Sequence, residues 1–300
     1  MEILLTNVFK RINLGYFYAA SCVLSWSFIP IVSRLGQSQL DNFQLIFWSN
    51  LISLFSIFVI FVLFNGLSYH WISLTSVFYS LFLGSLGCSI YYLFLYYGYA
   101  NGNSIEVLII QYSWPLQMIV LANFILRESL SISKLVAVIT GLGGVYIIIT
   151  KGELLNVQFS GMEVGISVLF GSFCFALFSV LSKISKVEIL QFTVLLFLGG
   201  SIISSGALFL FSDVQFPDQK EWVPVCLNGI IINGISYLLW LLALKNIPAT
   251  SAAVFIFFTP VLSAFWIVIF FDEVFYFSYI LGGGVVIFSS LYCLKNANSF

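Results

Sequence analysis

Charged side chains are scarce in this sequence. They make up 8% of its 300 residues and 61% are hydrophobic, whereas soluble domains carry roughly a quarter charged and about half apolar residues. The mean hydropathy is +1.08. No soluble single-domain fold could hide this much apolar surface, so the composition predicts an all-α polytopic membrane protein in contact with the lipid bilayer.

Three further absences exclude classes of partner and cofactor. The formal net charge is −1 and no basic run occurs, which argues against a nucleic-acid partner. The five cysteines form no CxxC pair, so small core side chains explain them better than metal ligands or disulfides. The single histidine, His70, falls in a predicted loop. We therefore expect no metal and no cofactor.

The residues that an intramembrane enzyme would need are also missing. A serine protease of this kind needs serine and histidine within the spans, and an aspartyl enzyme needs two aspartates there. The predicted spans contain neither set, and the sequence has no HExxH motif and no Walker A motif. We expect a protein that is not an enzyme and that works on a gradient; a scaffold or receptor remains a remote alternative.

Apolar runs long enough to cross a membrane fill most of the chain. A crossing helix needs about 20 apolar residues, so the run at 42–105 is too long for one, and the turn residues NGLSYH at 65–70 divide it. The run at 135–150 is the weakest candidate for a span. Lys134 and Lys151 at its ends can extend their charged groups to the membrane surfaces. Ten spans are predicted, near 12–33, 43–64, 73–97, 107–126, 135–150, 164–182, 189–212, 222–244, 246–271 and 274–294.

Lysine and arginine are distributed unevenly among the predicted loops. With the N-terminus in the cytoplasm, the outside segments hold three of them, Arg34, Lys151 and Lys220. The inside segments hold eight, Lys10, Arg11, Arg127, Lys134, Lys183, Lys186, Lys245 and Lys295. This bias predicts a multi-pass protein of the plasma membrane, the inner membrane of a bacterium, with both termini cytoplasmic. The N-terminus shows no cleavage site, so we expect no cleaved signal peptide.

Two segments 145 residues apart resemble each other. SWPLQMIVLANFILRES aligns without a gap with FTPVLSAFWIVIFFDEV, so that Pro115 matches Pro260 and Glu128 matches Glu273. Nine residues after each glutamate lies a small residue, Ala137 or Gly282, which would let two helices pack closely. Similarly, WSFIPIVSRL at 26–35 resembles FALFSVLSKI at 175–184. The chain therefore contains an internal repeat.

Each half of the chain holds five predicted spans. An odd number forces the second half to enter the membrane from the opposite side, so the repeats, 1–151 and 152–300, are predicted to be inverted. Inverted repeats with a site near the midplane between them are typical of secondary transporters.

The order of these features resembles the EamA family of the drug/metabolite transporter superfamily. That family has ten spans in two repeats, with a proline in the fourth helix of each, a glutamate at its end and a small-residue helix after it. YYLFLYYGYA followed by QYSWP, and SYLLWLLALKN at 236–246, are similar to its branch of aromatic amino acid exporters. This chain has Gln111 and Ser113 where that branch commonly has Asn and Leu. The resemblance implies export of a small solute.

Polar and aromatic side chains cluster where the fourth span should bend. Pro115 removes a backbone hydrogen bond and kinks the helix, and Gln111 and Trp114, three residues apart, would share a face. Such a face suits a cavity rather than lipid, although interhelical bonding and core packing remain the alternative. The substrate-binding candidates are Trp26, Tyr91, Tyr92, Tyr96, Gln111, Tyr112, Trp114, Tyr237 and Trp240, and the candidates for kinks and gating are Pro30, Pro115 and Pro260.

The remaining polar residues in the spans have structural interpretations. Tyr97 and Tyr99 are expected in the interfacial aromatic belt, and Glu106 is expected to favour the dipole at the start of its helix. Helix–helix hydrogen bonding is the expectation for Asn50, Asn123, Asn228 and Asn233. Glu128 and Glu273 end their helices near water and are expected to be structural.

The aromatic set predicts the kind of solute. Aromatic rings bury a large area and offer one polar tip, which suits an amphipathic small molecule. We expect a secondary transporter that exports amino acids with aromatic or large apolar side chains by alternating access, and that is monomeric. Efflux of drugs or organic cations, or uptake of a nucleoside or vitamin, is the alternative.

Overall fold

The computed structural model describes residues 2–36, 39–66, 71–129, 131–155, 157 and 159–297, with side chains from Ile12 to Cys293. In chain order its elements are α1 (Glu2–Trp26), α2 (Ile29–Gly36), α3 (Asn42–Asn65), α4 (Leu74–Gly84), η1 (Ser85–Ile90), α5 (Tyr91–Asn101), α6 (Ser104–Gln111), α7 (Trp114–Leu126), α8 (Ile132–Ile149), α9 (Met162–Ile184), α10 (Ile189–Phe211), α11 (Trp222–Leu227), η2 (Asn228–Ile235), α12 (Ser236–Asn246), α13 (Ala249–Phe255), α14 (Phe258–Phe271) and α15 (Phe277–Ala297). The elements named η are π-helical.

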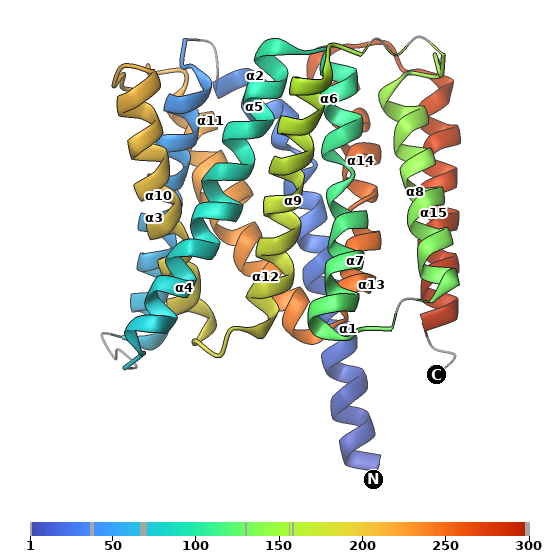
Figure 1. Cartoon of the computed structure of the whole chain (residues 1–300), viewed down its shortest axis with the longest axis horizontal. Coiled ribbons are helices and arrows are strands. Elements are labelled where there is room, and N and C mark those ends of the chain that lie inside the picture. The colour runs from blue at the N-terminus through green and yellow to red at the C-terminus, as the bar shows by residue number, and fades with distance from the viewer. Residues whose placement is uncertain are drawn as a thin grey trace.

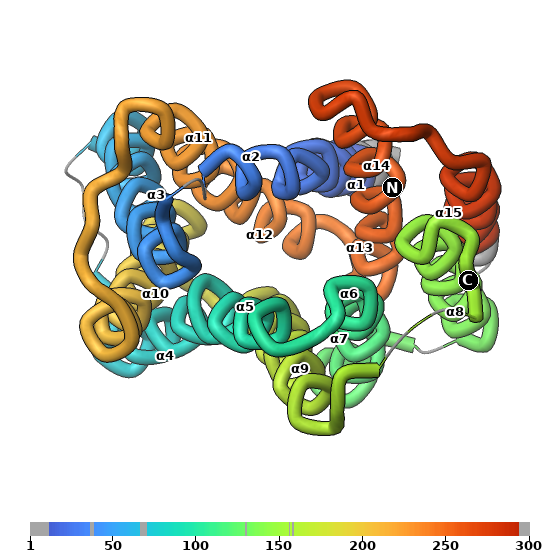
Figure 2. Tube along the Cα trace, turned by 90° about the horizontal axis from the view of Figure 1, so that it is seen from above, coloured from blue at the N-terminus to red at the C-terminus, as the bar shows by residue number. Residues whose placement is uncertain are grey.

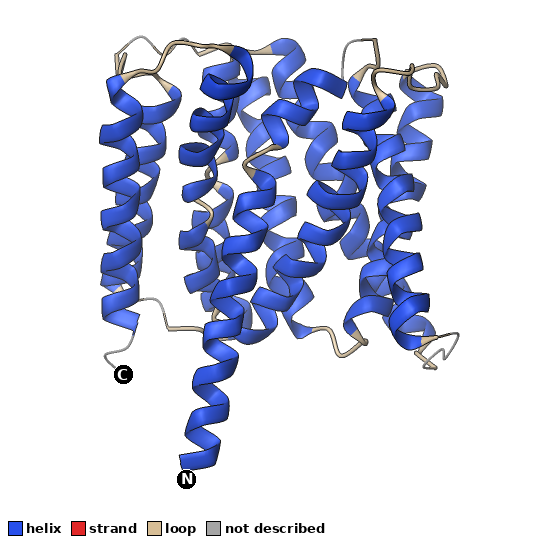
Figure 3. Ribbon diagram, turned by 180° about the vertical axis from the view of Figure 1, so that it is seen from behind, coloured by secondary structure: helices blue, strands red, loops and turns tan. Residues whose placement is uncertain are grey.

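The described part of the chain is helical and contains no strand (Figure 3). Nine of its helical stretches are long and apolar enough to cross a membrane, and α15 supplies a further apolar helix. Several of these stretches combine two or three elements, such as α1 with α2 and α6 with α7. Because lipid offers no hydrogen bonds, helices that pair their own backbone groups are the expected spanning structure. The predicted fold class is confirmed.

The path of the chain gives the two halves opposite directions. The start of α1 and the end of α15 lie on one side of the bundle, which we call the side of the termini (Figure 1). The turn between α7 and α8 lies on that same side, whereas its repeat counterpart, between α14 and α15, lies on the opposite side. An inverted repeat requires this arrangement.

Three membrane helices are interrupted by a two-residue turn shortly before a proline. The turns are Ser27–Phe28, Tyr112–Ser113 and Ile256–Phe257. Pro30 and Pro115 are the second residues after their turns, and Pro260 is the third. Proline tolerates the first turn of a helix because that position needs no N–H. In contrast α9, the repeat counterpart of α1 with α2, is continuous and has Ser179 at the position that matches Pro30.

Hydroxyl groups of neighbouring helices satisfy carbonyls that the interruptions leave free. The carbonyl of Gln111, four residues before Pro115, accepts a hydrogen bond from Ser172 Oγ at 3.2 Å. The carbonyl of Ser27 accepts one from Ser263 Oγ at 2.8 Å. Inside lipid this pairing is what makes a broken helix tolerable.

The last helices of the two repeats, α8 and α15, pack side by side at one end of the bundle (Figure 2). A Cβ added to Gly144 would come 2.7 Å from the carbonyl oxygen of Gly282, so only glycine permits this approach. The Ala137 carbonyl accepts a hydrogen bond from Ser289 on the facing helix. Both small residues expected from the repeat therefore lie at a close helix contact.

Candidate functional site

A small cavity lies beside the interruptions of all three broken helices. Its volume is about 50 Å³, and we call it the aromatic cavity. It is lined by Trp26, Ile29, Tyr91, Tyr92, Gln111, Tyr112, Trp114, Phe175, Ile256 and Thr259. Six of the nine predicted binding residues are therefore brought together there, and the lining comes from both repeats.

A second cavity of about 20 Å³ adjoins the first, since the two share the lining residues Ile29 and Tyr92. We call it the asparagine cavity. It is lined by Ile29, Ser33, Leu45, Ile46, Ser49, Cys88, Tyr92, Tyr96, Asn228 and Asn233. Tyr96 is thus a seventh predicted residue at the site, whereas the two asparagines and Ser49 were not among the candidates.

A groove between α3 and α5 leads from the asparagine cavity toward the surface. The groove has a volume of about 230 Å³ and shares Ile46 and Tyr96 with that cavity. Its outer lining includes the exposed Tyr97 and Asn101. The two inner cavities have room for a few waters rather than a metabolite, so their walls must part before a solute can bind.

Gln111 is held by two tyrosines at the edge of the aromatic cavity. Its Nε2 donates a hydrogen bond to the Tyr91 hydroxyl at 2.6 Å, and its Oε1 accepts one from the Tyr99 hydroxyl at 3.3 Å. The expected place of Tyr99 in the interfacial belt is wrong, because its polar tip turns inward to the amide. Tyr97 is 42% exposed, as a belt residue would be.

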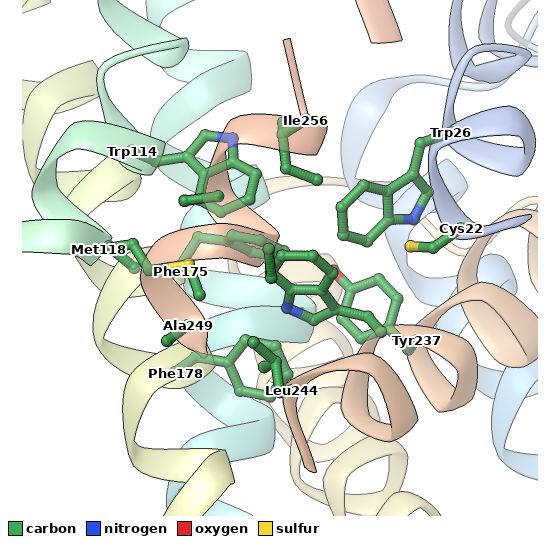
Figure 4. Packing of buried hydrophobic residues seen from close by; sticks show 14 of the residues in the cluster. Cys22, Trp26, Trp114, Met118, Phe175, Phe178, Tyr237, Leu244, Ala249 and Ile256 are labelled. Atoms are coloured by element: carbon green, nitrogen blue, oxygen red, sulfur yellow. The ribbon is translucent and has the colours of Figure 1, made fainter. Parts of the chain in front are cut away.

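Aromatic rings from both repeats pack against one another beside the cavity (Figure 4). Phe175 lies at the centre, with ring centroids 4.8 Å from Trp114, 5.8 Å from Trp26 and 6.1 Å from Tyr237. Trp240 lies 5.5 Å from Trp26. Edge-to-face geometry dominates these contacts, as ring quadrupoles favour.

Tyr237 and Trp240 line neither cavity. Both are buried, and their polar tips already have partners: the Tyr237 hydroxyl donates to the Gly87 carbonyl at 2.9 Å, and Trp240 Nε1 donates to Ser179 Oγ at 3.1 Å. Of the nine candidates, these two contact the other aromatic rings without lining either cavity. The structure therefore assigns them to the packed floor of the site.

Below the aromatic floor, an ion pair joins the two repeats on the side of the termini. Lys183 Nζ lies 3.3 Å from Glu128 Oε1, and the two side chains are 23% and 14% exposed. The Glu128 carboxylate also accepts hydrogen bonds from the backbone N–H groups of Ala249 and Thr250 at 2.9 and 3.0 Å, at the start of α13. Burial alone would raise the pKa of Glu128, but these amides and the Lys183 ammonium outweigh it, and the pKa lies below its ordinary value.

A second ion pair joins the repeats on the opposite side. Arg34 Nη1 lies 3.0 Å from Glu273 Oε1, and the two side chains are 59% and 39% exposed. The repeat matches Arg34 with Lys183 and Glu273 with Glu128. Each pair thus joins a cation of one repeat to a carboxylate of the other. The sequence shows that the two cations and the two carboxylates occupy matched positions. It does not show which cation pairs with which carboxylate.

Other polar residues have mixed outcomes. Helix–helix bonding is confirmed for Asn50, which donates to the Cys88 carbonyl at 3.0 Å, and for Asn228, which donates to Ser49 Oγ at 2.7 Å. It is wrong for Asn123 of α7, which donates to the carbonyl of Glu128, just past the end of its own helix. Glu106 starts its helix as expected, yet it is buried and accepts a hydrogen bond from the Ser160 N–H at 2.7 Å. His70 lies outside the described residues.

Comparison with known proteins gives one family. The sequence model of the EamA-like transporter family matches residues 13–150 and 164–294. A protein of Bacillus subtilis (strain 168) named as the uncharacterized transporter YoaV is 25% identical over 177 residues, which is 57% of this chain and 60% of that protein. The match thus spans less than two thirds of the relative's length. A crystal structure of another protein superposes with a TM-score of 0.83 at 17% identity, over 95% of this chain and 99% of that one, which shows the fold alone.

Proposed function

We propose that this chain, which belongs to the EamA-like transporter family, is a secondary transporter that exports neutral amino acids with aromatic or large apolar side chains. Similarity to the aromatic exporter branch of the family stays a prediction. The amino-acid proposal rests on the site rather than on the relatives.

The main support for the proposal is the chemistry of the residues that line the cavities. Among the described residues that line the two inner cavities there is no aspartate, glutamate, lysine, arginine or histidine. The lining offers aromatic faces with amide and hydroxyl groups, which suits an amphipathic solute with no net charge. A solute held by neutral hydrogen bonds can also leave again without breaking a buried ion pair.

The two ion pairs support alternating access. They lie on opposite sides of the bundle, each links the two repeats, and the inverted repeat relates them. In the proposed cycle, each pair closes the path on its own side and separates when that side opens. The difference in their exposure indicates that the side of the termini is the more tightly closed in this conformation.

A competition experiment tests the substrate class. The protein is reconstituted in vesicles, and uptake of labelled phenylalanine is measured with excess tryptophan, methionine, threonine or tetraphenylphosphonium. We expect tryptophan and methionine to compete strongly and threonine weakly, because the cavity is faced with rings. Competition by tetraphenylphosphonium without amino-acid transport would instead establish cation efflux, since aromatic faces also bind cations.

We also propose that both termini lie in the cytoplasm, from the uneven distribution of lysine and arginine. Cysteines are introduced at Ser129, beside α8, or at Gln219, between α10 and α11, in a chain whose half-buried Cys226 is serine. In intact cells an impermeant thiol reagent should label the cysteine at 219 and not the one at 129, although both positions are exposed. The reverse pattern would contradict the orientation.

A further inference from the structure

The third membrane helix of each repeat contains a π-helical segment. The segments η1 and η2 end at Ile90 and Ile235, which the repeat matches at 145 residues. Single π-helical turns inside α-helices occur frequently at functional sites. Since an isolated irregularity could be incidental, the recurrence of this one in both halves indicates that the fold requires it.

The π-helical segment η2 changes which residues share a face. Asn228 and Asn233 are five residues apart, and in an α-helix they would point about 140° away from each other. The hydrogen bonds of a π-helix join residues five apart, which brings such residues toward one side. Both asparagines indeed line the asparagine cavity.

Asn233 has hydrogen-bonding capacity that the protein leaves unused. Its side chain is 8% exposed and lines the cavity. Among the described residues, no side-chain or backbone group forms a hydrogen bond with its carboxamide, whereas Asn228 donates to Ser49 Oγ at 2.7 Å. Its amide lines a cavity and has no partner in the described part of the chain, so it is free to form hydrogen bonds with a polar group that enters the cavity.

The chemistry of the lining indicates what that group is. A carboxamide offers both donors and an acceptor, and the described residues that line the cavity include no aspartate, glutamate, lysine, arginine or histidine. At the matched position the first repeat has Cys88, so the polar pair is present on one side only. These features suit a head group that is neutral overall but carries both a hydrogen-bond acceptor and donors. An α-amino carboxylate is such a group.

We propose that Asn233, with Asn228 beside it, binds the amino and carboxylate groups of a transported amino acid, while the side chain of that amino acid lies in the aromatic cavity. The two cavities share Ile29 and Tyr92, so a single solute can occupy both when their walls part. This proposal rests on the proposed function and adds a head-group site to it.

The test compares phenylalanine with two molecules that each lack half of its head group, 3-phenylpropionate and 2-phenylethylamine. Binding is measured by thermal shift and by competition for transport in vesicles. For the unmodified protein we expect phenylalanine to bind at least about tenfold more tightly than either analogue. In Asn233→Leu the affinity for phenylalanine should fall about tenfold, the change that corresponds to the loss of one buried hydrogen bond, and the affinities for the analogues, each of which keeps only one of the two groups, should fall less.

Two variants complete the experiment. Asn246→Leu removes an asparagine of α12 that donates to the Leu242 carbonyl and lines neither cavity, so it should bind phenylalanine normally. Asn233→Ser adds no bulk and should weaken phenylalanine binding even if Asn233→Leu does not fold. If the unmodified protein binds no amino acid, the proposed function fails. If it binds phenylalanine and both Asn233 variants keep the full preference over the analogues, the head-group site alone is overturned.

Discussion

Glu128→Ala is expected to lower the free energy of unfolding by roughly 3 kcal/mol, because it leaves Lys183 half-buried without its counter-charge and removes the acceptor of two backbone N–H groups at the start of α13. Thermal unfolding in detergent measures the loss. In transport terms, the closed side of the bundle should open more often. A cysteine at the fully buried Ala253 of α13 should then react faster with a thiol reagent added from the side of the termini.

Glu273→Ala is the matched control at the repeat-related position. Its partner Arg34 is 59% exposed, and exposed ion pairs contribute only about 0–1 kcal/mol. The variant should therefore unfold almost as the unmodified protein does. Equal losses in the two variants would contradict the assignment of the Glu128–Lys183 pair as the tighter closure.

The same contact makes stability depend on pH. The pKa of Glu128 is lowered in the folded protein, so its stabilising contribution is complete above the ordinary value of 4.5 and is lost as the pH falls through the lower folded value. Glu128→Gln should lose part of this dependence. The loss of stability on mutation and the dependence of stability on pH are therefore two independent tests of the same contact.

The helices and the positions of their interruptions were predictable because each depends on local chemistry. A span in lipid must be about 20 residues long and must pair its own backbone groups, so apolar length predicts it. Pro115 and Pro260 have no N–H to donate, so they predict where their helices break. The close contact at Gly282 followed from a small residue at a matched position.

The details of the site depended on geometry that α-helical spacing misrepresents. Helix–helix bonding was the expectation for Asn228 and Asn233, and α-helical spacing would place them on different sides, whereas both line the asparagine cavity. Gln111 and Trp114 were placed on one face of a continuous helix, yet a turn separates them, and both reach the cavity because the chain bends there. Tyr237 and Trp240 were indistinguishable by type from the cavity residues; only their contacts place them in the floor.

Among the central tryptophans, Trp114 differs in what its polar tip contacts. Trp26 Nε1 donates to Ser236 Oγ at 2.7 Å and Trp240 Nε1 donates to Ser179 Oγ at 3.1 Å. Within the described part of the chain nothing accepts a hydrogen bond from Trp114 Nε1, although the residue is 4% exposed and lines the aromatic cavity. We therefore propose that Trp114 Nε1 donates a hydrogen bond to the solute.

Trp114→Ala is expected to remove about 3–5 kcal/mol of unfolding free energy, since it deletes a ring packed against Phe175 and Trp240, and to abolish measurable transport. Trp114→Phe and Trp240→Phe separate these effects, because each keeps a ring and loses one N–H. Both should lower the melting temperature modestly, but only Trp114→Phe should weaken phenylalanine binding, by about tenfold for one lost hydrogen bond. Isothermal titration of the two purified variants decides the matter. Equal weakening in both would mean that the floor and the cavity act as one unit, and unchanged binding in Trp114→Phe would place the solute away from this ring.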